Sequence, residues 1–316
     1  MLLKAEFQPV NVARGPIQRV IEAAGSIILG KQTKVRLALA CLLARGHLLI
    51  EDLPGVGKTT LAHVLARSLG LQFQRIQFTS DMLPADIIGV SVYERESGAF
   101  KFHPGPIFAQ VILADEVNRA TPKTQSALLE AMEEHQVTAE GETRPLPEPF
   151  FVIATQNPMH QVGTFPLPES QLDRFLMRLS LGYPDAKAER ELLKGAERRD
   201  MIQGMKPVMD GPQLMELQKA VPQMQVSDAL LDYVQQIINH TRHSPRFTQG
   251  LSPRAGVAVL RAAQSWAMME GRRQVLPEDV QAILPPVVGH RLHGNAEAVK
   301  AGFDPARELI GAVPIP

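Results

Sequence analysis

The stretch of sequence that decides the fold is Asp52-Leu53-Pro54-Gly55-Val56-Gly57-Lys58-Thr59-Thr60. A β-rich run, His47–Glu51, precedes it, and the helix-forming Leu61–Ala66 follows it. Glycines in such a turn let backbone N–H groups converge on phosphate oxygens at the positive end of a helix. Lys58 is then expected to contact the β- and γ-phosphates, and the Thr59 hydroxyl to ligate Mg²⁺. The alternative is a plain glycine turn with a surface lysine.

Four further apolar runs, separated by helical patterns, predict a parallel five-stranded sheet with flanking helices, an α/β fold. They are Phe73–Phe78, Val111–Asp115, Phe150–Thr155 and Arg178–Leu181. Two stretches alternate apolar and polar residues around a glycine, and each predicts an inserted hairpin. These stretches are Val90–His103 and Gln136–Leu146.

After Pro184 the pattern contains helices only, which predicts a small all-α domain. Ser227 precedes one apolar helical stripe, and Ser252-Pro253 and Pro277 open two further helices. Lys194–Pro212, rich in glycine, proline and charge, is expected to form a junction or an exposed loop. We therefore expect an α/β core at residues 1–184, a junction at 185–212 and a helical lid at 213–316.

Two carboxylates and an amide follow the apolar runs at the predicted carboxyl edge of the sheet. Such strand ends point into the ligand crevice of a parallel sheet. Asp115 is expected to hold Mg²⁺ through its water shell, and Glu116 to orient and deprotonate the water that attacks the γ-phosphate. Asn157 can hold that water or sense the γ-phosphate, although such an asparagine taken alone indicates only a turn.

Composition narrows the possible partners. Lysine plus arginine total 33 and aspartate plus glutamate total 33, so no net charge attracts nucleic acid or an anionic membrane. The single cysteine, Cys41, cannot form an intramolecular disulfide, and no apolar run approaches the roughly 20 residues of a membrane span. With no signal-peptide pattern, we expect a cytoplasmic protein without membrane insertion.

Taken together, these motifs resemble the AAA+ P-loop ATPases, and longer strings narrow the resemblance to the MoxR family. The strings are Arg75-Ile76-Gln77-Phe78-Thr79, Pro104-Gly105-Pro106-Ile107-Phe108, Leu113-Ala114-Asp115-Glu116-Val117-Asn118-Arg119-Ala120 and Leu167-Pro168-Glu169-Ser170-Gln171-Leu172-Asp173-Arg174-Phe175. The resemblance runs from Ile27 to about Leu284. Asp52 replaces the first glycine of the general phosphate-loop pattern, as it does in many sequences of this kind.

The resemblance implies ATP and Mg²⁺ as ligands, Mg-dependent ATP hydrolysis and a hexameric ring with ATP sites between subunits. It implies that Arg174 is the arginine finger, inserted into the ATP site of the neighbouring subunit. Arg178 is the other candidate for this role. The alternative for Arg174 is a surface ion pair with Asp173. Arg254 matches the second sensor that reaches back to the γ-phosphate; otherwise it is an ordinary arginine of a first helical turn. Ile28 and Gly30 resemble residues that border the adenine.

The family resemblance implies a chaperone-like remodelling ATPase that acts in maturation or metal insertion, usually with a partner that carries a von Willebrand factor A domain. A nucleic-acid motor is one alternative, because related hairpins contact DNA in helicases. Here the hairpins carry nearly balanced charges, which argues against binding a row of phosphates. These residues are Arg95, Lys101 and Arg144 against Glu94, Glu96, Glu140 and Glu142. The other alternative is a non-hydrolysing nucleotide switch, which the intact Lys58, Asp115, Glu116 and Asn157 disfavour.

Overall fold

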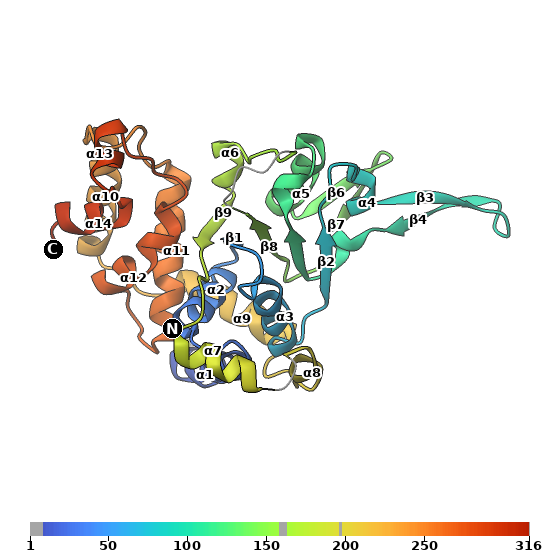
Figure 1. Ribbon diagram of the computed structural model, residues 1–316, viewed down its shortest axis with the longest axis horizontal. Coiled ribbons are helices and arrows are strands. Elements are labelled where there is room, and N and C mark those ends of the chain that lie inside the picture. Colours follow the sequence, from blue (N-terminus) through green and yellow to red (C-terminus); the bar gives the residue numbers. More distant parts are fainter. Residues whose placement is uncertain (1–8, 158–162, 196–197, 316) are drawn as a thin grey trace, which may run out of the picture.

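The computed structural model describes residues 9–157, 163–195 and 198–315, and its centre is a parallel five-stranded sheet. The strand order is β2-β5-β8-β1-β9, with β9 at the edge nearest the C-terminal helices (Figure 1). The strands are β1 His47–Glu51, β2 Phe73–Gln77, β5 Val111–Asp115, β8 Phe151–Gln156 and β9 Phe175–Leu179. The predicted α/β core is therefore confirmed.

The last strand differs from the prediction, because β9 begins three residues before the expected Arg178. Phe175 and Met177 are buried, whereas Arg178 interrupts the apolar run. On an edge strand this side chain can leave the core, so a charged residue does not end the strand.

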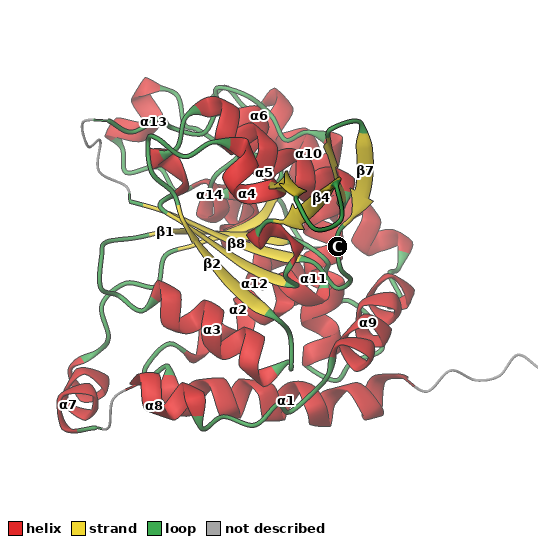
Figure 2. Cartoon of the chain, turned by 90° about the vertical axis from the view of Figure 1, so that its right-hand side faces the viewer, coloured by secondary structure: helices red, strands yellow, loops and turns green. Residues whose placement is uncertain are grey.

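Helices cover both faces of the sheet (Figure 2). One face packs against α1 Pro9–Ile27, α2 Gln32–Leu43 and α3 Lys58–Ser68, and the other against α4 Pro84–Ile88 and α5 Pro122–Glu134. Leu48 and Ile50 of β1 belong to the first hydrophobic cluster, and Leu49 belongs to the second. Such alternation in fully buried strands is typical of a parallel sheet between two helical layers.

Both predicted hairpins are present: β3 Gly89–Glu94 with β4 Ala99–Pro104, and β6 Gln136–Ala139 with β7 Glu142–Pro145. The β3–β4 hairpin projects away from the body of the molecule (Figure 1). Its base docks on the second hairpin, where Ser91 N–H donates to Glu140 Oε1 over 3.1 Å and Arg144 lies 3.8 Å from the centre of the Phe102 ring. Phe102 is thus a packing residue, whereas Phe100 is 74% exposed.

The rest of the chain after β9 is helical, as predicted. The helices are α7 Ala186–Lys194, α8 Arg198–Gln203, α9 Gly211–Ala220, α10 Asp228–His243, α11 Pro253–Met269, α12 Pro277–Val288, α13 Ala296–Lys300 and α14 Pro305–Ala312. The short helix α6 Glu169–Leu172 and the 3₁₀ turns Pro106–Phe108, Val117–Arg119 and Val221–Gln223 complete the structure. Ser227 and Ser252 cap α10 and α11 by accepting N–H bonds from Leu230 and Ala255. Within the described ranges, no helix combines the length and the hydropathy that crossing a bilayer requires.

The prediction of a junction or exposed loop at Lys194–Pro212 is wrong in part, because α8 lies within it. Ile202 and Met209 are buried, and Val208 N–H donates to the Ser68 carbonyl of α3 over 2.8 Å. Packing against α3 thus outweighs the local glycine and proline signals. The proposed limits at residues 184 and 212 stay predictions, and the first eight residues of that core lie outside the described ranges.

Candidate functional site

The phosphate loop lies between β1 and α3, as the sequence indicates. Gly55 and Gly57 adopt the left-handed backbone region, with φ of 81° and 95°, which glycine enters without strain. Gly57 caps α3, so the N–H groups of the first helical turn face the loop. Thr59 is an exposed residue of that turn. The arrangement provides the convergent donors and positive helix end that an anion site needs.

Lys58 is the first residue of α3, and its side chain folds over the loop. Its Nζ donates to the carbonyl oxygens of Asp52 over 2.6 Å and Leu53 over 3.1 Å. Burial lowers the pKa of Lys58, an effect opposed by the carboxylates of Asp52, Asp115 and Glu116. A cation held among these groups gains strongly from a phosphate partner.

Asp52, the departure from the general loop pattern, has a structural role. Its Oδ2 accepts hydrogen bonds from Ser180 Oγ over 3.1 Å, Leu181 N over 2.5 Å and Gly182 N over 2.7 Å. Although burial by itself raises the pKa of Asp52, these donors and the N–H of Leu53 outweigh it and hold the pKa below its usual value. The carboxylate fastens the phosphate loop to the segment after β9, a task that glycine could not perform.

Lys31 makes a second connection between the same two segments. Its buried Nζ donates to the carbonyl oxygens of Val56 over 2.8 Å and Gly182 over 2.7 Å. It adjoins the predicted adenine-bordering residues Ile28 and Gly30. Gly30 has a φ of 70°, and a Cβ there would lie 2.9 Å from that of Ala188. The candidate adenine segment therefore packs against α7.

The two predicted acids lie at the carboxyl end of β5 and are joined by one hydroxyl. Thr155 Oγ donates to Asp115 Oδ1 over 2.5 Å and accepts from the Glu116 N–H over 2.9 Å. Arg75 forms an ion pair with the other Asp115 oxygen at 2.6 Å. Gln77 donates to Glu116 over 3.0 Å. Sequence reasoning missed the roles of Thr155, Arg75 and Gln77, whose only signal was their place beside the predicted strand ends.

Asn157 connects the two halves of the site. Its Oδ1 accepts from Lys58 Nζ and its Nδ2 donates to Glu116 Oε1, both over 3.3 Å. The structure thus brings Lys58, Glu116 and Asn157 together.

The donor set is compatible with Mg²⁺. This ion prefers oxygen ligands and is commonly held by one or two carboxylates together with substrate phosphates. Thr59 and Asp115 offer such oxygens. Both Asp115 oxygens already carry hydrogen bonds within the protein, which suits contact through bound water better than a fully direct shell. No cluster of three or more His, Cys, Asp or Glu residues suited to a metal occurs among the described residues.

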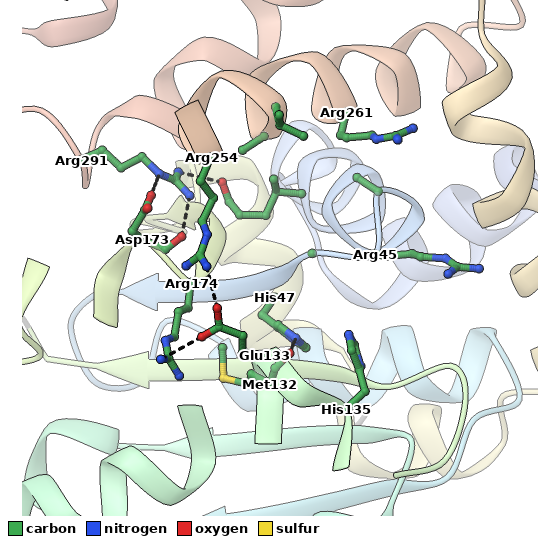
Figure 3. Close-up of a pocket in the computed structure, with 15 residues that line it drawn as sticks. Arg45, His47, Met132, Glu133, His135, Asp173, Arg174, Arg254, Arg261 and Arg291 are labelled. Atoms are coloured by element: carbon green, nitrogen blue, oxygen red, sulfur yellow. Dashed lines mark hydrogen bonds and ion pairs between the residues drawn. The ribbon is translucent and has the colours of Figure 1, made fainter. Parts of the chain in front are cut away.

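Arg174 and Arg254 lie together in a second place, a cavity of about 300 Å³ between core and lid (Figure 3). Both pair with Glu133, Arg174 at 2.8 Å and Arg254 at 2.6 Å. Asp173, the alternative partner of Arg174, pairs instead with Arg291 at 2.6 Å. The residues that line this cavity include none from the phosphate loop.

The role of Arg254 as the second sensor stays a prediction, and the packing of the lid explains why this side chain pairs with Glu133. Arg291, 6% exposed in its side chain, binds Asp173 and also donates to the Phe175 carbonyl over 2.7 Å. These bonds fix the lid against the start of β9. The first turn of α11 consequently faces the end of α5, where Glu133 lies.

Arg178, the other candidate for the arginine finger, forms two hydrogen bonds within its own chain. Its guanidinium donates to Glu51 Oε2 over 2.9 Å and to the Gly289 carbonyl over 2.5 Å. Glu51 ends the strand that leads into the phosphate loop, and Gly289 caps the C-terminus of α12. The side chain therefore bridges the core and the lid.

Comparisons with known proteins agree with this architecture. Residues 47–177 match the ATPase family associated with various cellular activities (AAA), and residues 239–309 match an AAA lid domain. The uncharacterized protein YeaC of Bacillus subtilis is 44% identical over 301 residues, 94% of either chain. Chaperone MoxR1 of Mycobacterium tuberculosis is 41% identical over 299 residues, 92% of this chain and 78% of that protein. The crystal structure of a protein from Cytophaga hutchinsonii has a TM-score of 0.91 at 35% identity and covers 99% of both chains.

The phosphate loop, the carboxylates after β5 and the helical lid define an AAA+ P-loop ATPase. Identity to MoxR1 over most of the chain narrows the class further. The chain belongs to the MoxR family of AAA+ ATPases, which confirms the resemblance seen in the sequence.

Proposed function

We propose that this protein hydrolyses ATP with Mg²⁺ in a hexameric ring and uses the energy to remodel partner proteins. The observation that carries the proposal is the bridge by Asn157 from Lys58 to Glu116, which joins a phosphate-binding cation to a candidate base. A non-hydrolysing switch has no need for a carboxylate held in that position.

In the proposed reaction, the phosphate loop binds the triphosphate through its N–H groups, with Lys58 on the β- and γ-phosphates. Thr59 and Asp115 would hold Mg²⁺, which would supply charge neutralisation at the phosphate oxygens. Glu116 accepts the proton of the attacking water, and Asn157 fixes that water in line with the γ-phosphate. Ile28 and Gly30 border the adenine.

The remaining cation comes from the neighbouring subunit. A trans arginine neutralises charge on the transferring phosphoryl group and accelerates related reactions by roughly 10³–10⁵. Arg174 suits this role because it faces a cavity that contains no residue of its own phosphate loop. Arg178 is less suited, because it does not line that cavity and its two bonds join β1 to the end of α12. Arg254 shares the Glu133 carboxylate with Arg174, so we assign it to the same interface.

The name chaperone MoxR1 supports a role in remodelling other proteins. We extend the proposal to a partner with a von Willebrand factor A domain, a client whose maturation or metal insertion needs ATP, and a cytoplasmic location. The nucleic-acid alternative is disfavoured by the hairpins, because Lys101 pairs with Glu94 at 3.1 Å and Arg144 with Glu142 at 2.6 Å. These cations are already neutralised by carboxylates of their own hairpins.

The test is complementation between two inactive chains. Arg174→Ala chains retain Glu116, and Glu116→Gln chains retain Arg174, so a mixed ring rebuilds interfaces that carry both groups. We expect ATP turnover to reappear on mixing. A mixture that stays inactive, although native mass spectrometry shows mixed rings, would refute a trans role for Arg174. Turnover absent from the unmodified ring would refute the ATPase assignment itself.

A further inference from the structure

One carboxylate holds two arginines from different parts of the chain. Glu133 is the penultimate residue of α5, Arg174 directly precedes β9, and Arg254 is the second residue of α11 in the lid. Glu133 Oε2 lies 2.8 Å from Arg174 Nη2, and Oε1 lies 2.6 Å from Arg254 Nη2. Figure 3 shows the two guanidinium groups converging on Glu133. Each carboxylate oxygen thus serves one arginine.

The arrangement leaves donors free to bind another anion. A guanidinium has five N–H donors. Arg174 uses one nitrogen for Glu133 and another for the Leu129 carbonyl at 2.6 Å, one helical turn earlier on α5. Among the described residues, the partner of Arg254 is Glu133 alone, and its side chain is 55% exposed. Both arginines therefore keep N–H groups that can donate hydrogen bonds to a phosphate.

Charge in the cluster also favours an incoming anion. Glu133 supplies one negative charge against the two positive charges of Arg174 and Arg254, while nearby Asp173 is matched by Arg291. Without the carboxylate, two guanidinium groups at this spacing would repel each other and separate. Glu133 therefore keeps both cations in place and leaves a net positive charge beside the cavity.

We infer that Glu133 is a positioning residue that holds Arg174 and Arg254 side by side, so that both meet the phosphates of a nucleotide bound to the adjacent subunit. The inference rests on the proposed function, because it needs ATP sites between subunits. Glu133 is therefore not assigned a contact with the reacting groups. It acts through the two arginines, one from the core and one from the lid, and makes their placement interdependent.

The first test compares Glu133→Ala with Glu133→Gln in the full-length ring. Misplacing a catalytic group by about 1 Å can cost about 10²-fold in rate, so we expect Glu133→Ala to lower kcat by up to about 10²-fold. Glutamine keeps one oxygen acceptor, so Glu133→Gln should lie between Glu133→Ala and the unmodified chain. The Kd of a fluorescent ATP analogue should change far less than kcat, since the phosphate loop is intact. Equal kcat in all three chains would overturn the inference.

The matched control is Glu308→Ala in α14, which removes a carboxylate paired with Arg246 at 2.8 Å. That ion pair has a distance similar to those of Glu133, but it lies in the lid, away from the cavity that Arg174 and Arg254 line. We expect kcat to stay at the unmodified level. A comparable loss in Glu308→Ala would attribute the effect of Glu133→Ala to general destabilisation and overturn the inference.

Mixing experiments separate this inference from the proposed function. Glu133→Ala chains retain Glu116. Glu116→Gln chains retain Glu133 with both arginines, so mixed rings should regain turnover. If Arg174→Ala complements Glu116→Gln but Glu133→Ala does not, Glu133 acts on its own chain's nucleotide and the inference fails while the proposed function stands. If neither pair recovers in proven mixed rings, the proposed trans arrangement fails. Adding Glu133→Ala to a chain that already carries Arg174→Ala and Arg254→Ala should lower turnover no further, and a further loss would contradict action through the arginines.

Discussion

The Thr155 hydroxyl donates a 2.5 Å hydrogen bond to Asp115 Oδ1, and both residues are buried. The same oxygen accepts the N–H of Glu116, whose backbone is left-handed with a φ of 56°. One hydroxyl of β8 therefore holds the Asp115 carboxylate and the backbone of Glu116. This contact connects the carboxylate expected to hold Mg²⁺ to the backbone of the residue expected to activate water.

Replacing Thr155 tests that relationship. Thr155→Val keeps the shape but leaves the Glu116 N–H without this acceptor, at a cost to stability of about 1–3 kcal/mol. We expect turnover to fall while ATP affinity is retained, because the phosphate loop is unaltered. Thr155→Ser, which retains the hydroxyl, should keep most of the activity. Steady-state turnover and urea unfolding measure the two effects, and undiminished turnover in Thr155→Val would refute the positioning role.

Substitutions of Lys58 and Glu116 should impair different steps, ATP binding for Lys58 and ATP hydrolysis for Glu116. Lys58→Ala removes a charge-assisted contact to phosphate and should weaken ATP binding about 10- to 100-fold. Glu116→Gln should bind ATP normally and lose roughly 10²–10⁴-fold in hydrolysis, because only this change removes the base. Isothermal titration and a phosphate-release assay distinguish the two. Equal losses of affinity in both variants would contradict the assignment.

Much of the core could be predicted because its signals are local. The glycine turn before Lys58 and the buried run before Asp115 each specify an element and its ligand-facing end within about ten residues. The same holds for the capped helices that start after Ser227 and Ser252. Since parallel strands share one carboxyl edge, Asn157 could be placed beside Glu116 from the sequence alone.

The contacts that sequence reasoning missed join residues far apart in the chain. Asp52 binds the N–H of Gly182, 130 positions away, and Arg254 reaches Glu133, 121 positions away. Which arginine meets which carboxylate depends on how the lid packs on β9, and no periodicity encodes that packing. The α8 helix was missed for a similar reason, since contact with α3 stabilises a segment whose own composition favours a loop.

Asp52 gives the protein a predictable acid sensitivity. Its pKa is lowered in the folded state, so its stabilising effect is complete above the unfolded value of about 3.9 and is lost as pH falls through the folded pKa. Asp52→Asn should cost about 1.5–3 kcal/mol of unfolding free energy at neutral pH. The difference between the two chains should stay constant from neutral pH down to about pH 5 and shrink below about pH 4. Urea unfolding across this pH range measures the difference in unfolding free energy. A difference independent of pH would contradict the stabilising role of the Asp52 carboxylate.

Ring assembly should depend on nucleotide. If each ATP lies between two subunits, ATP binds the assembled form better than the monomer and favours it by mass action. We expect ATP to raise the sedimentation coefficient of Glu116→Gln chains, which bind without hydrolysing. Lys58→Ala should show a much weaker response. A monomer that is fully active at high dilution would contradict this expectation.

Arg178 should behave differently from Arg174 because its two bonds join the core to the lid. Glu51 and the Gly289 carbonyl fasten the guanidinium between β1 and α12, so Arg178→Ala loosens the lid from the strand that carries the phosphate loop. We expect a lower unfolding temperature and reduced turnover. Mixing Arg178→Ala with Glu116→Gln should restore no activity, since the only chains with an intact Glu116 would still carry the damaged contact. Arg174→Ala, by contrast, should be rescued by the same partner. Recovery of turnover in the Arg178→Ala mixture would identify Arg178 as the arginine finger. The proposed role of Arg174 would then be refuted.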